Sequence, residues 1–232
     1  MIERYSLACT AAQVADHFRV DPYGFEKPRY NAAPSQLLPV ITTGSTGLSH
    51  FYWGTMPQWA KNKAISEKII NVHCEQISER ATLRKSLKKY RCLVPADGFY
   101  LWKRLGKKTT IPYRLRTPDK GLFGMVGFWE EFDDETGEVF HTFTLITCPA
   151  SPEVAALSDR MPAILKKEDY ATWLQPDADE DALLQLLEKT KKGILLENYT
   201  VSPRINDASN DEASLLLPAP PADQHGNLTL FS

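Results

Sequence analysis

The sequence lacks the features that mark several large classes of protein. It contains no run of about 18 apolar residues, so we expect no membrane-spanning helix. No apolar segment follows Arg4 near the N-terminus, so we expect no secretory signal. Only four residues are cysteines and none has C-x-x-C spacing, which argues against a disulfide framework or a zinc site and favours a reducing compartment. We predict a cytoplasmic protein without a metal or a cofactor.

The sequence also lacks a strong net charge. The formal charge is −2, so the protein as a whole does not attract a polyanion. Positive charge is concentrated locally, because Asp97 is the only acid between positions 80 and 108. This stretch is either a track for a phosphate backbone or a solvated helix face balanced by acids elsewhere in the fold. Its basic residues are Arg80, Arg84, Lys85, Lys88, Lys89, Arg91, Lys103, Arg104, Lys107 and Lys108.

Local patterns predict both helices and strands. Thr10 and Gln13 fit a capping box at the start of a short amphipathic helix. Asp97 and Gly98 predict a turn between an apolar strand and an aromatic strand. In 177–192 the acids come first and the lysines last, which suits the dipole of a helix. We expect a further helix at 76–90 and strands at 36–42, 48–53, 113–116, 122–129 and 140–147.

The order of these elements favours one fold class. Strands and helices do not alternate regularly, so a doubly wound parallel sheet is not expected. We predict a single α+β domain over 1–232, built from bent, mainly antiparallel, barrel-like sheets with peripheral helices. Pro218, Pro220 and Pro221 open a polar segment, so we expect 218–232 to be a poorly ordered tail.

Short motifs occur in a fixed order along most of the chain. They are Y-N-A-A-P at 30–34, W-G-T-M-P-Q-W at 53–59, N-V-H-C-E at 71–75, P-A-D-G-F-Y-L-W at 95–102, S-D-R-M-P at 158–162, and V-S, N and N-D at 201–202, 206 and 210–211. With these motifs the chain resembles the SOS response-associated peptidase-like (SRAP) family, whose members process abasic sites in DNA. The resemblance implies that Met1–Tyr5, Asn71, Leu101 and Ser158 meet at one cleft.

The resemblance also implies a specific chemistry. Active members begin Met-Cys-Gly-Arg, and loss of the methionine leaves a cysteine with a free amine and a thiol. The amine attacks the aldehyde of the opened abasic sugar, water leaves to give an imine, and the thiol closes a thiazolidine ring. A glutamate and a histidine assist the proton transfers, an asparagine holds the lesion, and arginines hold the flanking phosphates.

This chain departs from that pattern where the chemistry occurs. Ile2 stands in place of the cysteine, Leu101 in place of the glutamate and Ser158 in place of the histidine. A bulky second residue also blocks removal of the initiator methionine, so we expect Met1 to stay. No internal cysteine can replace the nucleophile, because its amine is tied up as an amide, and we interpret Cys9, Cys74, Cys92 and Cys148 as small buried apolar residues. We therefore expect the usual crosslinking to be lost, since a nucleophile and its base must both be in reach.

The remaining motif residues are candidates for DNA contact. We assign Arg4 and Arg160 to phosphates, Trp59 to stacking on an unpaired base, and Asn71, the retained site residue, to the lesion. His73 replaces an arginine of the pattern, so it can bind phosphate only when protonated. Three of these residues also have a structural alternative: an exposed strand residue for Arg4, core for Trp59 and a satisfied buried amide for Asn71. The predicted DNA-binding residues are Arg4, Asn31, Trp59, Asn71, His73 and Arg160.

Three functions remain open on the sequence. The first is a DNA-damage-associated protein that binds single-stranded or abasic DNA in a positively charged groove, close to the nucleoid, without crosslinking. The second is an active abasic-site enzyme or peptidase that uses the amine of Met1. The third is a pseudo-enzyme whose groove binds another partner, with protein partners unspecified.

Overall fold

The computed structural model describes residues 1–54, 70–106, 109–133 and 137–229, and within them the fold is α+β with mostly antiparallel sheets. The larger sheet closes on itself, because β10 pairs with β4, β4 with β3, β3 with β6, β6 with β9, and β9 with β10. The predicted fold class is therefore confirmed. The strands of this barrel are β3 (Leu37–Thr42), β4 (Ser49–Trp53), β6 (Arg91–Ala96), β9 (Phe123–Asp133) and β10 (Val139–Pro149).

Three short strands extend the barrel, and a second sheet stands beside it. The short strands β5 (Asn71–His73), β11 (Arg160–Pro162) and β12 (Ile164–Leu165) pair with β10, β10 and β9. In the second sheet the order is β13-β8-β7-β1-β2. Its strands are β1 (Tyr5–Leu7), β2 (Arg29–Ala32), β7 (Gly98–Leu105), β8 (Thr109–Arg116) and β13 (Glu197–Thr200).

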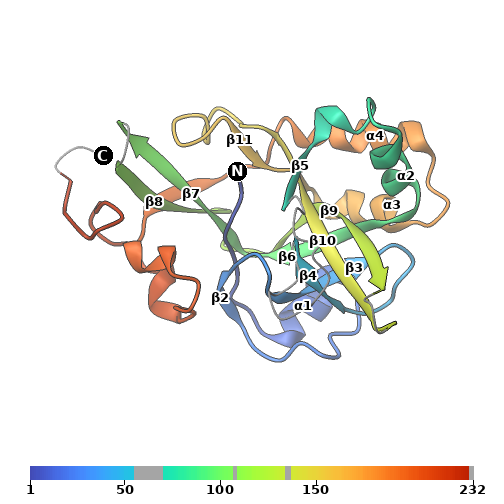
Figure 1. The fold of residues 1–232 in the computed structure, drawn as a ribbon, viewed down its shortest axis with the longest axis horizontal. Helices are drawn as coiled ribbons and strands as arrows, with labels where there is room; N and C mark the ends of the chain where they lie inside the picture. Colours follow the sequence, from blue (N-terminus) through green and yellow to red (C-terminus); the bar gives the residue numbers. More distant parts are fainter. Residues whose placement is uncertain (55–69, 107–108, 134–136, 230–232) are drawn as a thin grey trace.

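The helices lie at the periphery, as expected. In Figure 1 the helices α2, α3 and α4 gather at one end of the molecule, while β7 and β8 form an arm toward the other end. The α-helices are α1 (Ala11–Phe18), α2 (Ala81–Lys89), α3 (Tyr170–Leu174) and α4 (Glu180–Thr190). Short 3-10 helices are η2 (Cys74–Gln76), η3 (Lys167–Asp169), η4 (Pro203–Asn206) and η5 (Ala213–Leu216).

Several local predictions are confirmed. Thr10 caps α1 with both bonds of the capping box, since its side chain accepts from the Gln13 N–H and the Gln13 side chain accepts from the Thr10 N–H. β3 and β4 form the predicted hairpin. α4 begins behind Asp179, whose carboxylate accepts from the Ala182 N–H at 3.1 Å.

Two local predictions need correction. The helix expected at 76–90 begins at Ala81, because η2 occupies Cys74–Gln76 and fully buries Ile77 just beyond it. The turn expected at Asp97 does not fold β6 and β7 onto each other. Asp97 alone joins the two strands, β6 pairs within the barrel, and β7 pairs within the second sheet. The chain crosses from one sheet to the other at this residue.

The C-terminal segment contacts the second sheet in the described residues. Val201 and Pro218 form an isolated bridge, as do Ala222 and Leu228. The Thr110 N–H donates to the side chain of Gln224 at 2.9 Å. Residues 218–224 of this segment therefore contact β8 and the end of β13, and residues 225–229 bond back to 221–223.

Candidate functional site

The N-terminal segment is held in place by its neighbours in the second sheet. β1 pairs with β2 and β7, and the Tyr100 N–H extends the ladder by donating to the Arg4 carbonyl at 3.1 Å. Ile2 is fully buried, whereas Met1 is 68% exposed. The side-chain nitrogen of Asn71 donates to the Ile2 carbonyl at 2.7 Å. The structure thus brings Ile2 and Asn71 into contact, although they lie 69 positions apart in the sequence.

Asn71 reaches this position through the end of β10. β5 runs parallel to β10 with Asn71 opposite Leu145 and His73 opposite Thr147, and β11 is antiparallel to β10 with Arg160 opposite Pro149. The two short strands therefore flank the last residues of β10. We call residues 1–4, Asn71–His73 and Arg160–Pro162 together the rim.

The amide of Asn71 has an unused acceptor. Its side chain is buried, and its Oδ1 atom has no hydrogen-bond partner in the described structure. A buried polar atom without a partner costs about 1–3 kcal/mol, so it is commonly satisfied by a ligand or by water. His73, two residues along the strand, is exposed at the rim.

Arg160 is engaged in an ion pair. Its guanidinium donates to the two carboxylate oxygens of Glu75 at 2.9 and 3.0 Å and to the Thr147 carbonyl at 2.7 Å. The hydrogen bonds from Arg160 lower the pKa of Glu75 to about 2. The arginine side chain is 16% exposed and that of Glu75 is 39% exposed. The fork that would bind a phosphate is therefore occupied by a carboxylate of the same chain.

The other chemical positions are apolar or engaged. Leu101 is buried and belongs to the same core cluster as Ile2. Ser158 is half-buried, and its Oγ atom accepts from the Arg160 N–H at 3.1 Å. A hydrocarbon side chain neither donates nor accepts a proton, so Leu101 cannot act as an acid or a base.

Arg4 and Asn31 both meet the C-terminal segment. Arg4 donates to the carbonyls of Glu3 and Asn206 at 2.7 and 3.4 Å, and burial lowers its pKa although Glu3 and Asp207 act in the opposite sense. Asn31 is fully buried, and its amide nitrogen donates to the carbonyls of Ile205, Asp207 and Asn210. The Asn31 side chain therefore fastens this loop inside the protein rather than facing solvent.

The same loop contains the last of the sequence motifs, at 206 and 210–211, and Asp211 gives that motif a structural role. One carboxylate oxygen of Asp211 accepts from the N–H groups of Tyr30 and Asn31 at 2.6 and 2.9 Å, and the other pairs with Arg29 at 2.8 Å. The motifs at 30–34 and 206–211 thus form one hydrogen-bonded unit. Trp59, predicted to stack on a base, lies outside the described residues.

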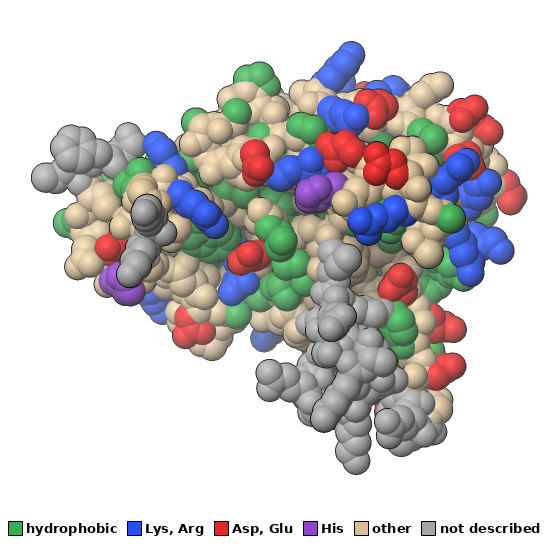
Figure 2. Space-filling model, turned by 45° about the horizontal axis from the view of Figure 1, so that its top comes forward, with side chains coloured by type: hydrophobic (Ala, Val, Ile, Leu, Met, Phe, Trp, Pro, Cys, Tyr) green, Lys and Arg blue, Asp and Glu red, His purple; other side chains and the backbone are tan. Residues whose placement is uncertain are grey.

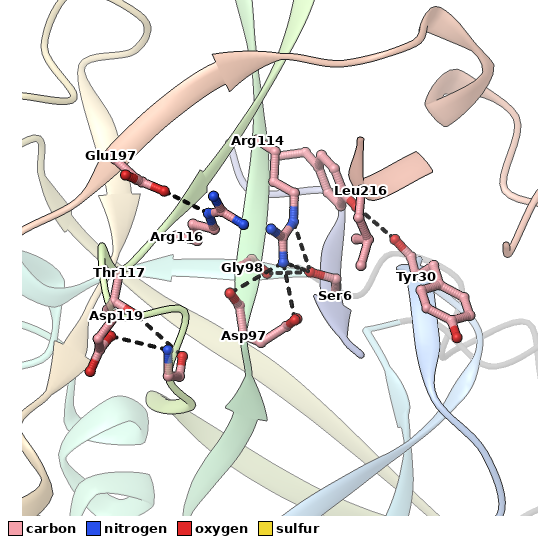
Figure 3. Close-up of polar contacts among 12 residues, drawn as sticks. Ser6, Tyr30, Asp97, Gly98, Arg114, Arg116, Thr117, Asp119, Glu197 and Leu216 are labelled. Atoms are coloured by element: carbon pink, nitrogen blue, oxygen red, sulfur yellow. Dashed lines mark hydrogen bonds and ion pairs between the residues drawn. The ribbon is translucent and has the colours of Figure 1, made fainter. Parts of the chain in front are cut away.

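A buried ion pair helps to hold β1 in its place within the second sheet. Arg114 donates to the carboxylate of Asp97 at 3.1 Å and to the Ser6 hydroxyl at 3.1 Å, and the Asp97 N–H donates to the Ser6 carbonyl (Figure 3). A Cβ atom on Gly98 would lie 2.8 Å from the guanidinium, so a larger residue there would require Arg114 to shift. The D-G pair at 97–98 thus places a buried arginine, a role that the sequence pattern does not reveal.

The cysteines are not candidate nucleophiles. All four are buried, which confirms their interpretation as small apolar residues. Burial raises the pKa of Cys9 and of Cys74 to about 12 and that of Cys148 to about 11, and it also raises the pKa of Cys92. These thiols are protonated near neutral pH and poorly nucleophilic.

Part of the positive charge in the basic stretch at 80–108 is balanced by an acid elsewhere in the fold, as one of the two interpretations predicts. Arg84 and Lys88 both pair with Glu180 on α4 at 2.7 Å. Arg91 is fully buried and donates to four carbonyls, those of Leu87, Lys88, Trp173 and Gln175, so it is not part of a surface track. Lys107 and Lys108 lie outside the described residues.

The described ranges also bear on metal binding and on membrane insertion. They contain no group of three or more His, Cys, Asp or Glu side chains placed to hold a metal ion. None of the helices in these ranges is both long enough and apolar enough to cross a membrane.

Comparison with known proteins adds the family. The model for the family described as SOS response associated peptidase (SRAP) matches residues 1–208. The chain is 36% identical to the abasic site processing protein YoqW of Bacillus subtilis (strain 168), over 93% of this chain and 99% of the relative. It is 26% identical to the abasic site processing protein HMCES of Mus musculus, over 83% of this chain and 65% of the relative.

A solved structure supports the same assignment. A crystal structure of a protein from Bacteroides thetaiotaomicron superimposes with a TM-score of 0.79 at 25% identity, covering 93% of this chain and 99% of that one. The family match spans the barrel, the second sheet and every described residue of the rim. The chain belongs to the SOS response associated peptidase (SRAP) family.

Proposed function

We propose that this protein acts in the DNA-damage response by binding single-stranded DNA, including strands with an abasic site, at the rim, without the thiazolidine crosslink of its family pattern. The names of its relatives support a role at abasic sites. The observation that carries the proposal is the contact between Asn71 and the Ile2 carbonyl, which leaves a buried amide oxygen without a partner beside the N-terminal segment. The site of action would be DNA in the cytoplasm.

The rim offers groups that suit a DNA strand. Asn71 supplies the acceptor for the lesion, and His73 is exposed two residues away on the same strand. Arg160 suits a phosphate through its planar fork, provided that Glu75 yields its place. Arg4 is a weaker candidate, because its guanidinium is partly buried against carbonyls. Asn31 acts at a distance, by fastening the loop that Arg4 contacts.

The rim does not offer the groups for the crosslink. Ring closure needs an amine and a thiol on one residue, and position 2 holds a buried isoleucine. Proton transfer needs an acid or base, and position 101 holds a leucine packed in the same core cluster. These two side chains fill with hydrocarbon the place where the family pattern has reactive groups.

A second candidate function is a slow reaction at the amine. In a chain that begins at Met1, the α-amine belongs to the rim, and Met1 is 68% exposed. An unprotonated amine can attack the aldehyde of an abasic site and form a reversible imine with loss of water. Borohydride reduction would convert this imine into a stable amine link.

The proposal is tested with one DNA strand in two forms. A titration against single-stranded DNA with and without an abasic site, at two salt concentrations, should show binding that weakens with salt. Heating the wild-type complex should leave no crosslinked species. Absence of binding to both strands would overturn the proposal in favour of a pseudo-enzyme with another partner, and a heat-stable adduct would overturn the loss of chemistry.

A restoring variant tests the reason for the loss. The combined changes Ile2→Cys, Glu3→Gly, Leu101→Glu and Ser158→His return the expected groups to the positions where the family pattern has them. If the frame around Asn71 is intact, this variant should form some heat-stable crosslink with abasic DNA. Replacing Asn71 by Ala in the same variant should reduce the yield.

A further inference from the structure

The outer face of α2 carries an unusual density of positive charge. Residues 80–89 hold five cations and no acid, in a protein whose net charge is −2. Leu87 is fully buried and Leu83 packs against the core, so these two leucines hold the helix to the barrel and turn its basic side outward. Figure 2 shows Lys and Arg side chains gathered at the end of the molecule where α2 and α4 lie, with acidic side chains among them.

Only part of this charge is neutralised within the protein. Glu180 pairs with Arg84 and Lys88, whereas Lys85 and Lys89 are exposed and make no ion pair or hydrogen bond among the described residues. A hollow of about 450 Å³ lies against this face. Its lining comprises Ser78, Glu79, Ala81, Arg84, Lys85, Lys88 and Lys89. The surface is thus a shallow trough whose lysines are available to an anion.

The trough lies close to the rim along the chain. Glu75, which holds Arg160, belongs to η2, and α2 follows after Arg80. Five residues span at most about 18 Å when extended, which is about the length of five phosphates along one strand of B-form DNA. A strand bound at Arg160 can therefore continue onto α2.

A second hollow on the other side of Lys85 favours nucleic acid as the occupant. It measures about 470 Å³ and runs between α2 and β9, and its lining includes Lys85, Tyr90 and Trp129 together with the acidic residues Glu130 and Glu131. Tyr90 and Trp129 pack edge to face with ring centroids 5.2 Å apart. Lys85 beside these two aromatic rings suits a phosphate and a base of a single strand, whereas an anionic lipid surface would call for exposed apolar side chains.

We propose that the outer face of α2 binds the phosphate backbone of a DNA strand that continues beyond the rim, with Lys85 and Lys89 as the contacting residues. This inference rests on the proposed function, because it assumes a strand held at the rim. The DNA that contacts α2 would lie outside the lesion, so the contribution of α2 to the affinity depends on the length of the strand.

The test compares a double variant with a matched control. Lys85→Gln with Lys89→Gln removes the two unpaired charges, and Lys166→Gln with Lys192→Gln removes two exposed charges beside a different hollow. Fluorescence anisotropy is measured with single strands of about six and about twenty nucleotides over a range of salt. The slope of log K against log salt changes by about 0.7 for each phosphate that the protein neutralises, so the slope of the double variant should be shallower by about 1.4 on the long strand. The short strand and the control should be unchanged.

The outcomes separate the two proposals. If the wild type binds the long strand and the double variant keeps its affinity and slope, the inference about α2 is overturned while the proposed function stands. An equal loss on both strand lengths also overturns it, because the lysines would then act at the rim. If the wild type binds neither strand, the proposed function fails and the inference fails with it. A thermal melt of each variant verifies that the exposed substitutions leave the fold intact.

Discussion

Replacing Glu75 by Gln should strengthen DNA binding. The carboxylate holds the guanidinium of Arg160 by two hydrogen bonds of 2.9 and 3.0 Å, so a phosphate must displace it to use the same fork. An amide cannot form a bidentate ion pair, and it does not repel a phosphate. The Thr147 carbonyl, at 2.7 Å, still holds one nitrogen of the guanidinium in place.

The size of the effect follows from the exposure of the pair. The two side chains are 16% and 39% exposed, so the pair is close to a surface salt bridge, which contributes about 0.2–1 kcal/mol. Repulsion between two unit negative charges about 4 Å apart in water costs about 1 kcal/mol. Since the introduced amide can still accept one hydrogen bond from Arg160, part of the first contribution cancels, and we expect a net gain of about 1 kcal/mol, which is about fivefold in Kd.

Fluorescence anisotropy with single-stranded DNA at low salt measures this change. Glu168→Gln removes an equal charge from an exposed residue without an ion pair in the described structure, and it should leave Kd nearly unchanged. In an Arg160→Gln background the gain from Glu75→Gln should largely disappear, because the two residues act on one site. Weaker binding by the single variant would refute the reasoning and would make Glu75 a support for Arg160 rather than its competitor.

Two further predictions concern stability. The folded-state pKa of Glu75 is depressed from 4.5 to about 2, so the ion pair stabilises the protein fully above pH about 4.5 and loses its effect as the pH falls toward about 2. Urea titrations of wild type and Glu75→Gln should therefore give a difference in unfolding free energy that disappears over this pH range. Arg114→Met leaves the carboxylate of Asp97 without its buried cation, so it should lower the free energy of unfolding by about 3 kcal/mol. Asp97→Asn in the same background should recover part of this loss. A decrease below about 1 kcal/mol for Arg114→Met would show that the pair is dispensable.

Features that depend on neighbouring residues were predictable from the sequence. The capping box of Thr10 and Gln13 closes within four residues, and the hairpin of β3 and β4 follows from two apolar runs around a glycine turn. The first residue of α2 was not predictable from the sequence, because it depends on tertiary packing. Ile77 enters the core behind η2, and the helix can begin only after the chain has turned away from β10.

Features that depend on distant partners were missed or misread. Arg91 reads as one more surface cation, yet it is fully buried because carbonyls from α2 and from the end of α3 surround it. Asp97 reads as a turn residue, yet its partner Arg114 comes from β8, and only the sheet register brings them together. Asn31 is predicted to contact DNA, and the sequence does not reveal that its amide nitrogen binds carbonyls about 175 positions away. The sequence pattern of a single segment cannot reveal these contacts, because each partner comes from a distant segment.

The motifs of this chain therefore serve two purposes that the sequence does not separate. Asn31 with Asp211, and Asp97 and Gly98 with Arg114, build the frame that holds the N-terminal segment. The rim residues supply the groups that a ligand can contact. Because the frame contacts are internal, they are satisfied whether or not the rim is reactive.

This division gives a physical reason for the proposed loss of the crosslinking chemistry within a retained fold. Ile2 and Leu101 are both almost fully buried, and burying one such side chain contributes about 1.5–3 kcal/mol to stability. Apolar residues at these two positions thus stabilise the frame, whereas an amine-bearing thiol and a carboxylate would have to be kept polar and accessible at its edge. This contribution to stability comes from positions 2 and 101, and the acceptor of Asn71 and the fork of Arg160 are left in place. Binding without crosslinking is the function that these retained groups favour.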